Sequence, residues 1–193
     1  MHLHFKTETM KTYQASGKEI QLYNFTGIVA ETGKNMETIV SGGGGGGYSY
    51  QGTGGTAPVS IRSRTVVHDQ FFLVDAKGNE MSFQLQDFNI ACRRDNKLTV
   101  IWGIKKGKDK GPYIIVHNHS TNSTFYDDKS MARLFRLSPL LLFGGGLLAV
   151  IILWNIIGGW ILAIAIGGLI YYEITLRKQI KAFKNSIDFT EFA

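Results

Sequence analysis

The sequence contains a single cysteine, Cys92, among 193 residues. One cysteine cannot form an internal disulfide, and it excludes a zinc site built on four cysteines. Proline is also scarce, with three residues, and charged residues make up 19% of the chain. This composition argues against an intrinsically disordered chain, and the lone thiol fits a reducing compartment.

Charge is absent from one long stretch, because residues 137–172 contain no Lys, Arg, Asp, Glu or His. A helix that crosses a bilayer needs about 20 apolar residues, so this stretch is too long for one span and fits two. The sequence therefore predicts a two-helix transmembrane hairpin over residues 137–176, with spans at about 137–153 and 157–175. A hairpin that dips into the bilayer without crossing it is the alternative.

Aromatic and basic residues mark the ends of the uncharged stretch. Those assigned to the membrane interface are Trp154, Trp160, Tyr171, Tyr172, Arg133, Arg136, Arg177 and Lys178. Basic residues favour the cytoplasmic side, and the first 20 residues contain no apolar core of a signal peptide. We therefore expect a multi-pass protein of a bacterial inner (plasma) membrane, with both termini cytoplasmic and membrane lipids among its partners.

Small residues recur at four-residue spacing in both predicted spans. They are Gly145, Ala149, Gly159, Ala163 and Gly167. Faces of this kind let helices approach closely in lipid. Two interpretations stay open: the spans pack on each other within one chain, or the same faces build a homo-oligomer.

Residues 1–130 are expected to form a cytoplasmic β-rich domain, either an antiparallel sandwich or a small barrel. Strand-forming residues recur there between short turn signals. The predicted hairpins pair residues 27–30 with 36–41, 70–75 with 81–86, and 98–104 with 113–117.

A glycine-rich loop at residues 41–58 interrupts the strand pattern. It lacks the closing Gly-Lys-Ser/Thr of a P-loop and the βαβ unit of a dinucleotide site. It is interpreted as a flexible surface loop or as a contact loop for a partner or a neighbouring subunit. The contact residues of the second interpretation are Gly42, Gly47, Tyr48 and Tyr50.

Two basic segments flank the predicted hairpin: a lead-in at residues 131–136 and a C-terminal tail at residues 177–193. Leu176, Ile180, Phe183 and Ile187 have helical spacing. This helix is expected either beside an anionic leaflet or packed on the β domain.

His117 and His119 are the strongest candidates for chemistry, because alternate residues of a strand share one face. They could bind a metal with His68 or Asp69 as a third ligand, although a hydrogen-bonded polar face explains them more simply. Cys92 lacks any surrounding catalytic signature, and no cofactor is implied. The lysine-rich hairpin at residues 105–110 indicates a solvated loop or a lipid headgroup contact, and nucleic acid is not expected among the partners.

The sequence thus predicts a non-enzymatic binding or scaffolding protein, anchored in the membrane, that forms a homo-oligomer and binds a protein partner of unknown identity. One alternative is an oligomeric channel, or a membrane-perturbing protein, that uses the hairpin as its pore. The other is a metal- or ligand-binding β domain centred on His117 and His119.

Overall fold

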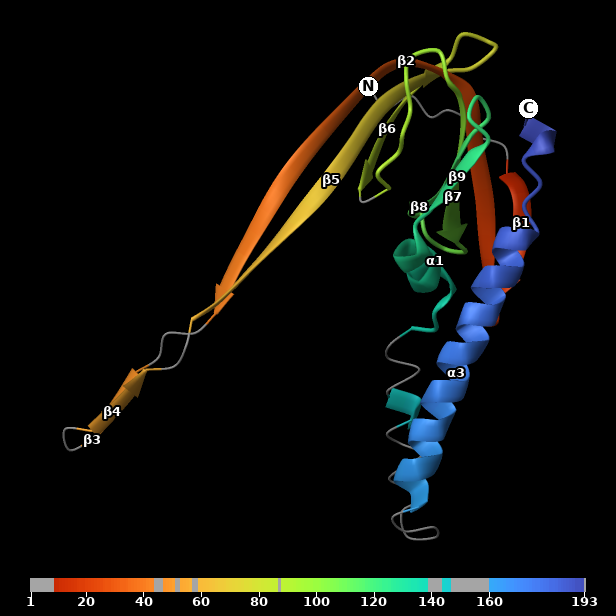
Figure 1. Ribbon diagram of the computed structural model, residues 1–193. Coiled ribbons are helices and arrows are strands. Elements are labelled where there is room, and N and C mark those ends of the chain that lie inside the picture. Colours follow the sequence, from red (N-terminus) through yellow and green to blue (C-terminus); the bar gives the residue numbers. More distant parts are fainter. Residues whose placement is uncertain are drawn as a thin grey trace. The chain divides into compact units, whose positions relative to one another are not determined.

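A computed structural model describes residues 9–43, 47–50, 53–56, 59–86, 88–138, 144–146 and 160–192. Antiparallel β structure dominates, with two α-helices among the described elements (Figure 1). The elements are β1 (Thr9–Ala15), β2 (Lys18–Gly43), β3 (Gly47–Tyr50), β4 (Thr53–Thr56), β5 (Ser60–Val74), β6 (Glu80–Gln86), β7 (Lys97–Lys105), β8 (Tyr113–Asn118), β9 (Ser123–Tyr126), α1 (Asp128–Phe135), α3 (Trp160–Asn185) and a 3-10 turn (Thr190–Phe192).

The chain divides into two compact units. Unit 1 comprises Met1–Gly27 and Lys97–Ala193, and unit 2 comprises Ile28–Asn96. The long strand β2 contributes its first residues to unit 1 and the rest to unit 2.

Unit 1 is built on the antiparallel strands β1, β2, β7, β8 and β9, in that order. A tight turn at Ser16 and Gly17 joins β1 to β2, and both residues have positive φ, 48° and 71°. Two consecutive positive φ values are typical of the type I′ hairpin turn, which matches the twist of the strands it joins.

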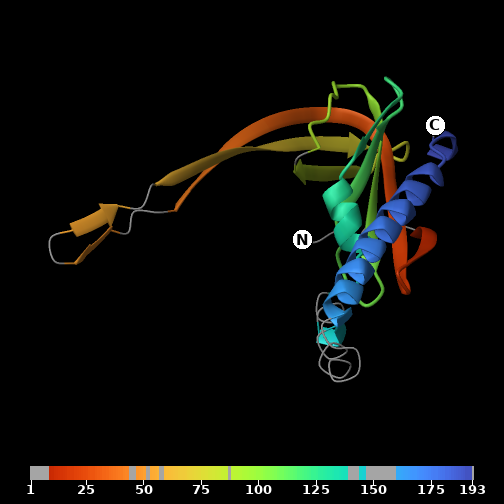
Figure 2. The same cartoon turned by 60° about the horizontal axis from the view of Figure 1, so that its bottom comes forward.

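Two helices pack on the sheet of unit 1. Asp127 caps α1 by accepting a hydrogen bond from the Ser130 backbone N–H, and α1 buries one side of its short length. The C-terminal half of α3 lies along the same sheet in both views (Figures 1 and 2). The shared core consists of Ala15, Ile20, Leu22, Ile101, Ile114, Ile115, Met131, Leu134, Phe135, Leu176, Phe183 and Ile187.

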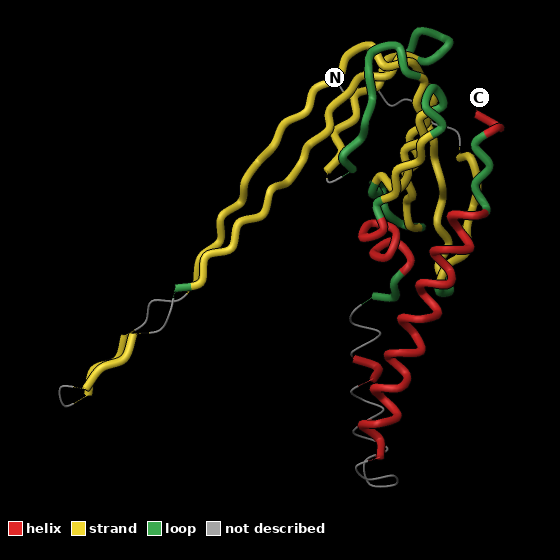
Figure 3. The backbone as a smooth tube through the Cα atoms, in the orientation of Figure 1, coloured by secondary structure: helices red, strands yellow, loops and turns green. Residues whose placement is uncertain are grey.

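Unit 2 is dominated by a two-stranded ribbon. β2 pairs with β5 in antiparallel register from Ile28↔Val74 to Gly43↔Ser60, and Figure 3 shows the two strands side by side. β6 pairs with the C-terminal part of β5, whereas β3 and β4 pair with each other.

The predicted transmembrane hairpin is wrong. Among the described residues, no helix has both the length and the apolar character needed to span a bilayer. The uncharged part of α3, residues 160–172, extends only about 20 Å at 1.5 Å per residue, and the rest carries five charged side chains. The expected multi-pass inner-membrane location is overturned by the same finding, as is the transmembrane character.

The tail helix follows one of its two interpretations. Leu176 and Phe183 of α3 are buried in the core of unit 1, as is Ile187 just after the helix, so the C-terminal half of α3 packs on the β structure. Met131, Leu134 and Phe135 are likewise buried, so the basic lead-in is the amphipathic helix α1.

The strand predictions were confirmed in part. The hairpins β5–β6 and β7–β8 form as expected. The turn expected at residues 32–35 is wrong, because β2 is continuous there and its backbone is held by β5. The segment expected as a flexible glycine-rich loop contains the paired strands β3 and β4. The described strands of the chain form open sheets rather than the predicted sandwich or small barrel.

Candidate functional site

The ribbon of β2 and β5 has two chemically different faces. Residues paired across an antiparallel ladder point to the same side, and side chains alternate along each strand. One face carries the pairs Met36↔Val67, Thr38↔Thr65, Val40↔Ser63 and Gly42↔Ile61. The opposite face carries Glu37↔Val66, Ile39↔Arg64 and Ser41↔Arg62. The first set contains no charged residue, and we call it the apolar ribbon face.

The base of this face belongs to the core of unit 2. Phe71 lies on the same side of β5 and stacks on Phe83, with ring centroids 5.6 Å apart. The segment after β6 covers this part, since the buried Asp69 carboxylate accepts a hydrogen bond from the Ile90 backbone N–H (3.1 Å). Lys34 joins the cluster through its ammonium group, 3.6 Å from the Asp69 carboxylate. The segment after β6 is therefore held on the ribbon at the Lys34↔Asp69 pair.

Beyond that pair, the large apolar side chains Met36, Val40 and Ile61 of the same face are exposed. Their exposed fractions are 71%, 65% and 70%. An isolated two-stranded hairpin is marginally stable in water, and a stable sheet normally packs its apolar face on something else. The apolar ribbon face therefore begins in the core of unit 2 and extends beyond the segment that follows β6.

The N-terminal half of α3 exposes a second apolar surface. Its exposed large side chains are Trp160, Ile164, Ile166, Leu169, Ile170, Tyr171 and Ile174. Of the predicted helix-packing residues, Ala163 is exposed and a Cβ added to Gly145 or Gly167 would meet no atom within 4 Å. Ala149 and Gly159 lie outside the described residues. Exposed apolar surface of this extent is typical of an interaction site.

The residues predicted at a membrane interface serve several local contacts. Arg136 forms an ion pair with Glu173, and the Tyr172 hydroxyl accepts a hydrogen bond from the Leu137 backbone N–H. Arg133 is exposed and its carbonyl accepts a hydrogen bond from Lys105. The exposed residues Arg177 and Lys178 lie on α3, as do Trp160 and Tyr171, whereas Trp154 is outside the described part.

The predicted contact loop is described mainly through its backbone. Gly42 is exposed near the end of β2. Gly47, Tyr48 and Tyr50 form β3, but their side chains lie outside the described structure. In the lysine-rich hairpin, Lys106 forms an ion pair with Glu19 (2.8 Å). One of the lysines expected to contact lipid headgroups is therefore already paired within the chain.

His117 and His119 lie side by side, with ring centroids 4.6 Å apart. His117 Nδ1 is 2.8 Å from the Thr124 hydroxyl, and His119 Nε2 is 2.8 Å from the Thr99 hydroxyl. Burial lowers the pKa of both imidazoles, and repulsion of a protonated His119 by His117 and Lys97 lowers the pKa of His119 further. Both rings are therefore neutral at neutral pH.

A cavity of about 590 Å³ adjoins the two histidines and is also lined by Tyr126 and Asp188. His68, a predicted third ligand, belongs to unit 2 and lies 3.4 Å from the Glu37 carboxylate. Across the described ranges, no three His, Cys, Asp or Glu side chains group closely enough to hold a metal ion. Cys92 is half-buried, with its sulfur 3.5 Å from the Thr32 hydroxyl.

The apolar ribbon face was missed because its residues alternate with polar ones across a predicted turn. The available signal was the alternation of Ile61, Thr65 and Val67 with Arg62 and Arg64. Comparison of the chain with family models, curated proteins and solved structures found no match.

Proposed function

We propose that this chain is a non-enzymatic scaffold that assembles with copies of itself. The observation that carries the proposal is the uncovered part of the apolar ribbon face in unit 2. A face that is uncharged and continuous with a covered core needs a partner of the same character. A second copy of the chain supplies such a partner.

Self-association fits the chemistry of the ribbon. In a two-fold dimer each surface contacts the same surface of its partner, so a surface with charges of one sign would repel its copy. Met36, Val40 and Ile61 lie on the uncharged face, whereas Arg62 and Arg64 lie on the other face. Two apolar ribbon faces can therefore pack together without electrostatic repulsion.

The apolar half of α3 provides a further contact in the same assembly. Trp160 and Ile164 have exposed fractions of 76% and 61%. Gly167 and Gly168 have open space where a side chain would stand, so another helix could approach the backbone closely there. This is the helix-face assembly expected from the sequence.

Substitutions on neighbouring residues test the ribbon contact. Val40→Asp places a carboxylate on the apolar ribbon face, and Ile39→Asp places one on the opposite face beside Arg64. Multi-angle light scattering should show an oligomer for the natural chain and for Ile39→Asp, and a smaller species for Val40→Asp. A monomeric natural chain, or equal effects of the two substitutions, contradicts the ribbon contact.

A matched experiment addresses α3. Ile170→Asp introduces a charge on the exposed apolar half, and Lys178→Asp changes an exposed position further along the same helix. Loss of assembly only with Ile170→Asp supports a helix contact. Binding of the natural chain to lipid vesicles, without self-association, would assign this surface to lipid instead.

Ligand binding at His117 and His119 is the second candidate, and the adjoining cavity favours it. Neutral imidazoles can ligate a metal or hydrogen-bond a polar ligand. Elemental analysis of the purified protein tests the metal version, and the absence of a stoichiometric metal would remove it.

A further inference from the structure

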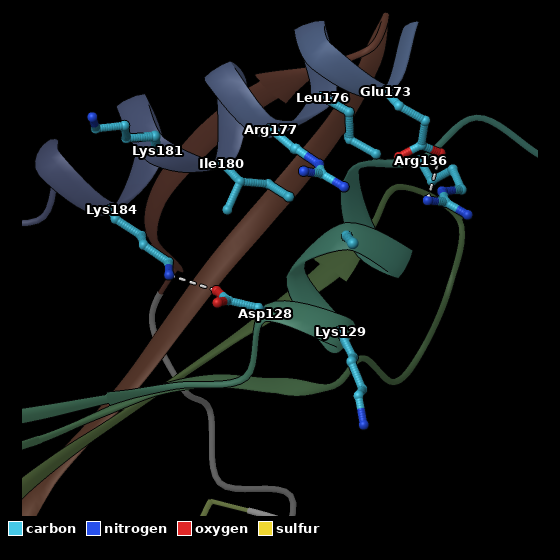
Figure 4. Close-up of a pocket in the computed structure, with 10 residues that line it drawn as sticks. Asp128, Lys129, Arg136, Glu173, Leu176, Arg177, Ile180, Lys181 and Lys184 are labelled. Atoms are coloured by element: carbon cyan, nitrogen blue, oxygen red, sulfur yellow. Dashed lines mark hydrogen bonds and ion pairs between the residues drawn. The ribbon is translucent and has the colours of Figure 1, made fainter. Parts of the chain in front are cut away.

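A cleft of about 510 Å³ lies between α1 and α3 in unit 1 (Figure 4). Two ion pairs join its walls. Arg136 Nη2 is 2.7 Å from Glu173 Oε1, and Lys184 Nζ contacts the Asp128 carboxylate. Figure 4 shows these pairs at opposite ends of the cleft, where they hold the two helices together.

The cleft has an excess of positive charge. Its ionised lining comprises Asp128, Glu173, Lys129, Arg136, Arg177, Lys181 and Lys184. The two carboxylates are already paired with Lys184 and Arg136. Within the described structure, no acidic side chain forms an ion pair with the other three basic residues. Unpaired cations gathered in a cleft attract an anion more strongly than cations on an open surface.

Arg177 is placed to make the direct contact. Its guanidinium extends from α3 into the space between the two ion pairs (Figure 4). Lys129 and Lys181 extend outward at the rim and add positive potential. A guanidinium presents parallel N–H donors that match two oxygens of a phosphate or carboxylate group.

The floor of the cleft is apolar. Leu176, next to Arg177 in the sequence, has an exposed fraction of 2%, and Ile180 is partly buried one turn further along α3. A ligand that fills the cleft would therefore place its charged group at Arg177 and an apolar body on this floor. Ligand sites commonly combine such apolar lining with a few polar groups that fix orientation.

We propose that this cleft binds a phosphate monoester that carries an apolar body. A phosphate monoester is close to a dianion at neutral pH, and it offers oxygens to Arg177 within the positive potential of the rim lysines. A monocarboxylate carries less charge and leaves part of the positive excess without a partner. The site is separate from the surfaces proposed for self-association.

Isothermal titration calorimetry of the full chain tests the site with three probes: phenyl phosphate, inorganic phosphate and benzoate. Phenyl phosphate should have the lowest Kd, because it alone supplies both the dianion and the ring. Arg177→Gln should raise its Kd about tenfold, as expected for the loss of a charge-assisted hydrogen bond. Lys178→Gln removes a neighbouring exposed charge outside the cleft and should leave the Kd unchanged.

A co-sedimentation experiment identifies the source of the ester. Phosphatidylcholine vesicles that contain phosphatidic acid should bind the natural chain but not Arg177→Gln if a lipid headgroup is the ligand. If the vesicles bind neither chain while phenyl phosphate still binds, the ligand is a soluble ester.

Three results would overturn the proposal: an unchanged Kd in Arg177→Gln, benzoate binding as tight as that of phenyl phosphate, or no binding of either phosphate probe at millimolar concentration. Circular dichroism of Arg177→Gln confirms that the exposed substitution leaves the fold intact. Light scattering on the same samples reports self-association separately, so failure of one proposal does not affect the other.

Discussion

His117 of β8 and Phe189, which follows α3, stack face to face with ring centroids 4.2 Å apart and planes inclined by 12°. The contact ties the C-terminal segment to the sheet of unit 1. It also removes the imidazole from water, since His117 has an exposed fraction of only 6%. Because burial favours the neutral ring, this packing contact makes the stability of unit 1 depend on pH.

Acidification should destabilise unit 1 through His117. Burial lowers its native pKa below the ordinary value of 6.5, so the unfolded chain binds the proton first as pH falls. The contribution of His117 to the free energy of unfolding is fully present above about pH 6.5 and is lost as pH falls through the native pKa. Urea denaturation between pH 8 and pH 5 measures this change.

His117→Phe is the informative variant for that experiment. It keeps an aromatic ring against Phe189 but removes the titrating group, together with the contact to Thr124. Its stability should vary less between pH 8 and pH 5 than that of the natural chain. An identical pH dependence in the two proteins would show that His117 does not titrate in this range.

Phe183→Ala should release the C-terminal half of α3. Phe183 is fully buried, and its ring centroid lies 5.1 Å from that of Phe135 and 5.0 Å from that of Tyr13. Truncation of a buried phenylalanine leaves a cavity and costs about 3–5 kcal/mol. Thermal and urea denaturation should show that loss, whereas Lys178→Ala, on the exposed side of α3, should change stability by about 0.5 kcal/mol or less. Equal stabilities of the two variants would argue against the observed packing.

Gly103→Ala should destabilise the contact of β7 with α1. A Cβ at this position would lie 2.5 Å from Leu134 and 3.2 Å from Ile20, so both side chains must move. Overpacking of this kind costs about 1–3 kcal/mol. Gly33→Ala is the control, because its Cβ would meet nothing within 4 Å. Urea denaturation should separate the two, and a loss in Gly33→Ala as large as that in Gly103→Ala would contradict the explanation.

Asp69 should stabilise unit 2 mainly as a hydrogen-bond acceptor. Asp69→Ala leaves the Ile90 N–H without its partner and Lys34 without its counter-charge, at an expected cost of about 1–3 kcal/mol. Asp69→Asn keeps an acceptor oxygen and should lose less. Hydrogen exchange of the Ile90 amide reports the local effect, and equal protection in all three proteins would refute it.

Hairpins with strong local turn signals were predictable from the sequence. The segment between β5 and β6 contains Asp75, whose carboxylate accepts hydrogen bonds from the backbone N–H groups of Lys77 and Asn79, and Gly78 with φ of 79°. These residue types favour a turn wherever they occur together, so the prediction needed no distant contact. Similar turn-forming residues at 32–35, which include Gly33 and Asn35, were misleading, because pairing with β5 holds that backbone extended.

The candidate surfaces were less predictable, because each depends on which segment covers another. Leu176 and Ile170 are both apolar residues of α3, yet the first is buried under α1 and the sheet and the second is exposed. Helical periodicity indicates that a helix has an apolar side but does not indicate the partner. The transmembrane prediction ended the second span at about residue 175, whereas α3 continues to Asn185 and packs Phe183 in the core of unit 1.

By itself, the sequence determined the properties that act over a few residues: the β-rich character, the β5–β6 and β7–β8 hairpins and the helical spacing that begins at Leu176. The tertiary structure alone decided that β2 runs unbroken, that α3 packs on the sheet and that Arg177 lies between two ion pairs. The difference has a physical cause. Turn and strand preferences arise from local backbone sterics, whereas burial and electrostatic pairing depend on segments that are distant in the chain and meet only after folding.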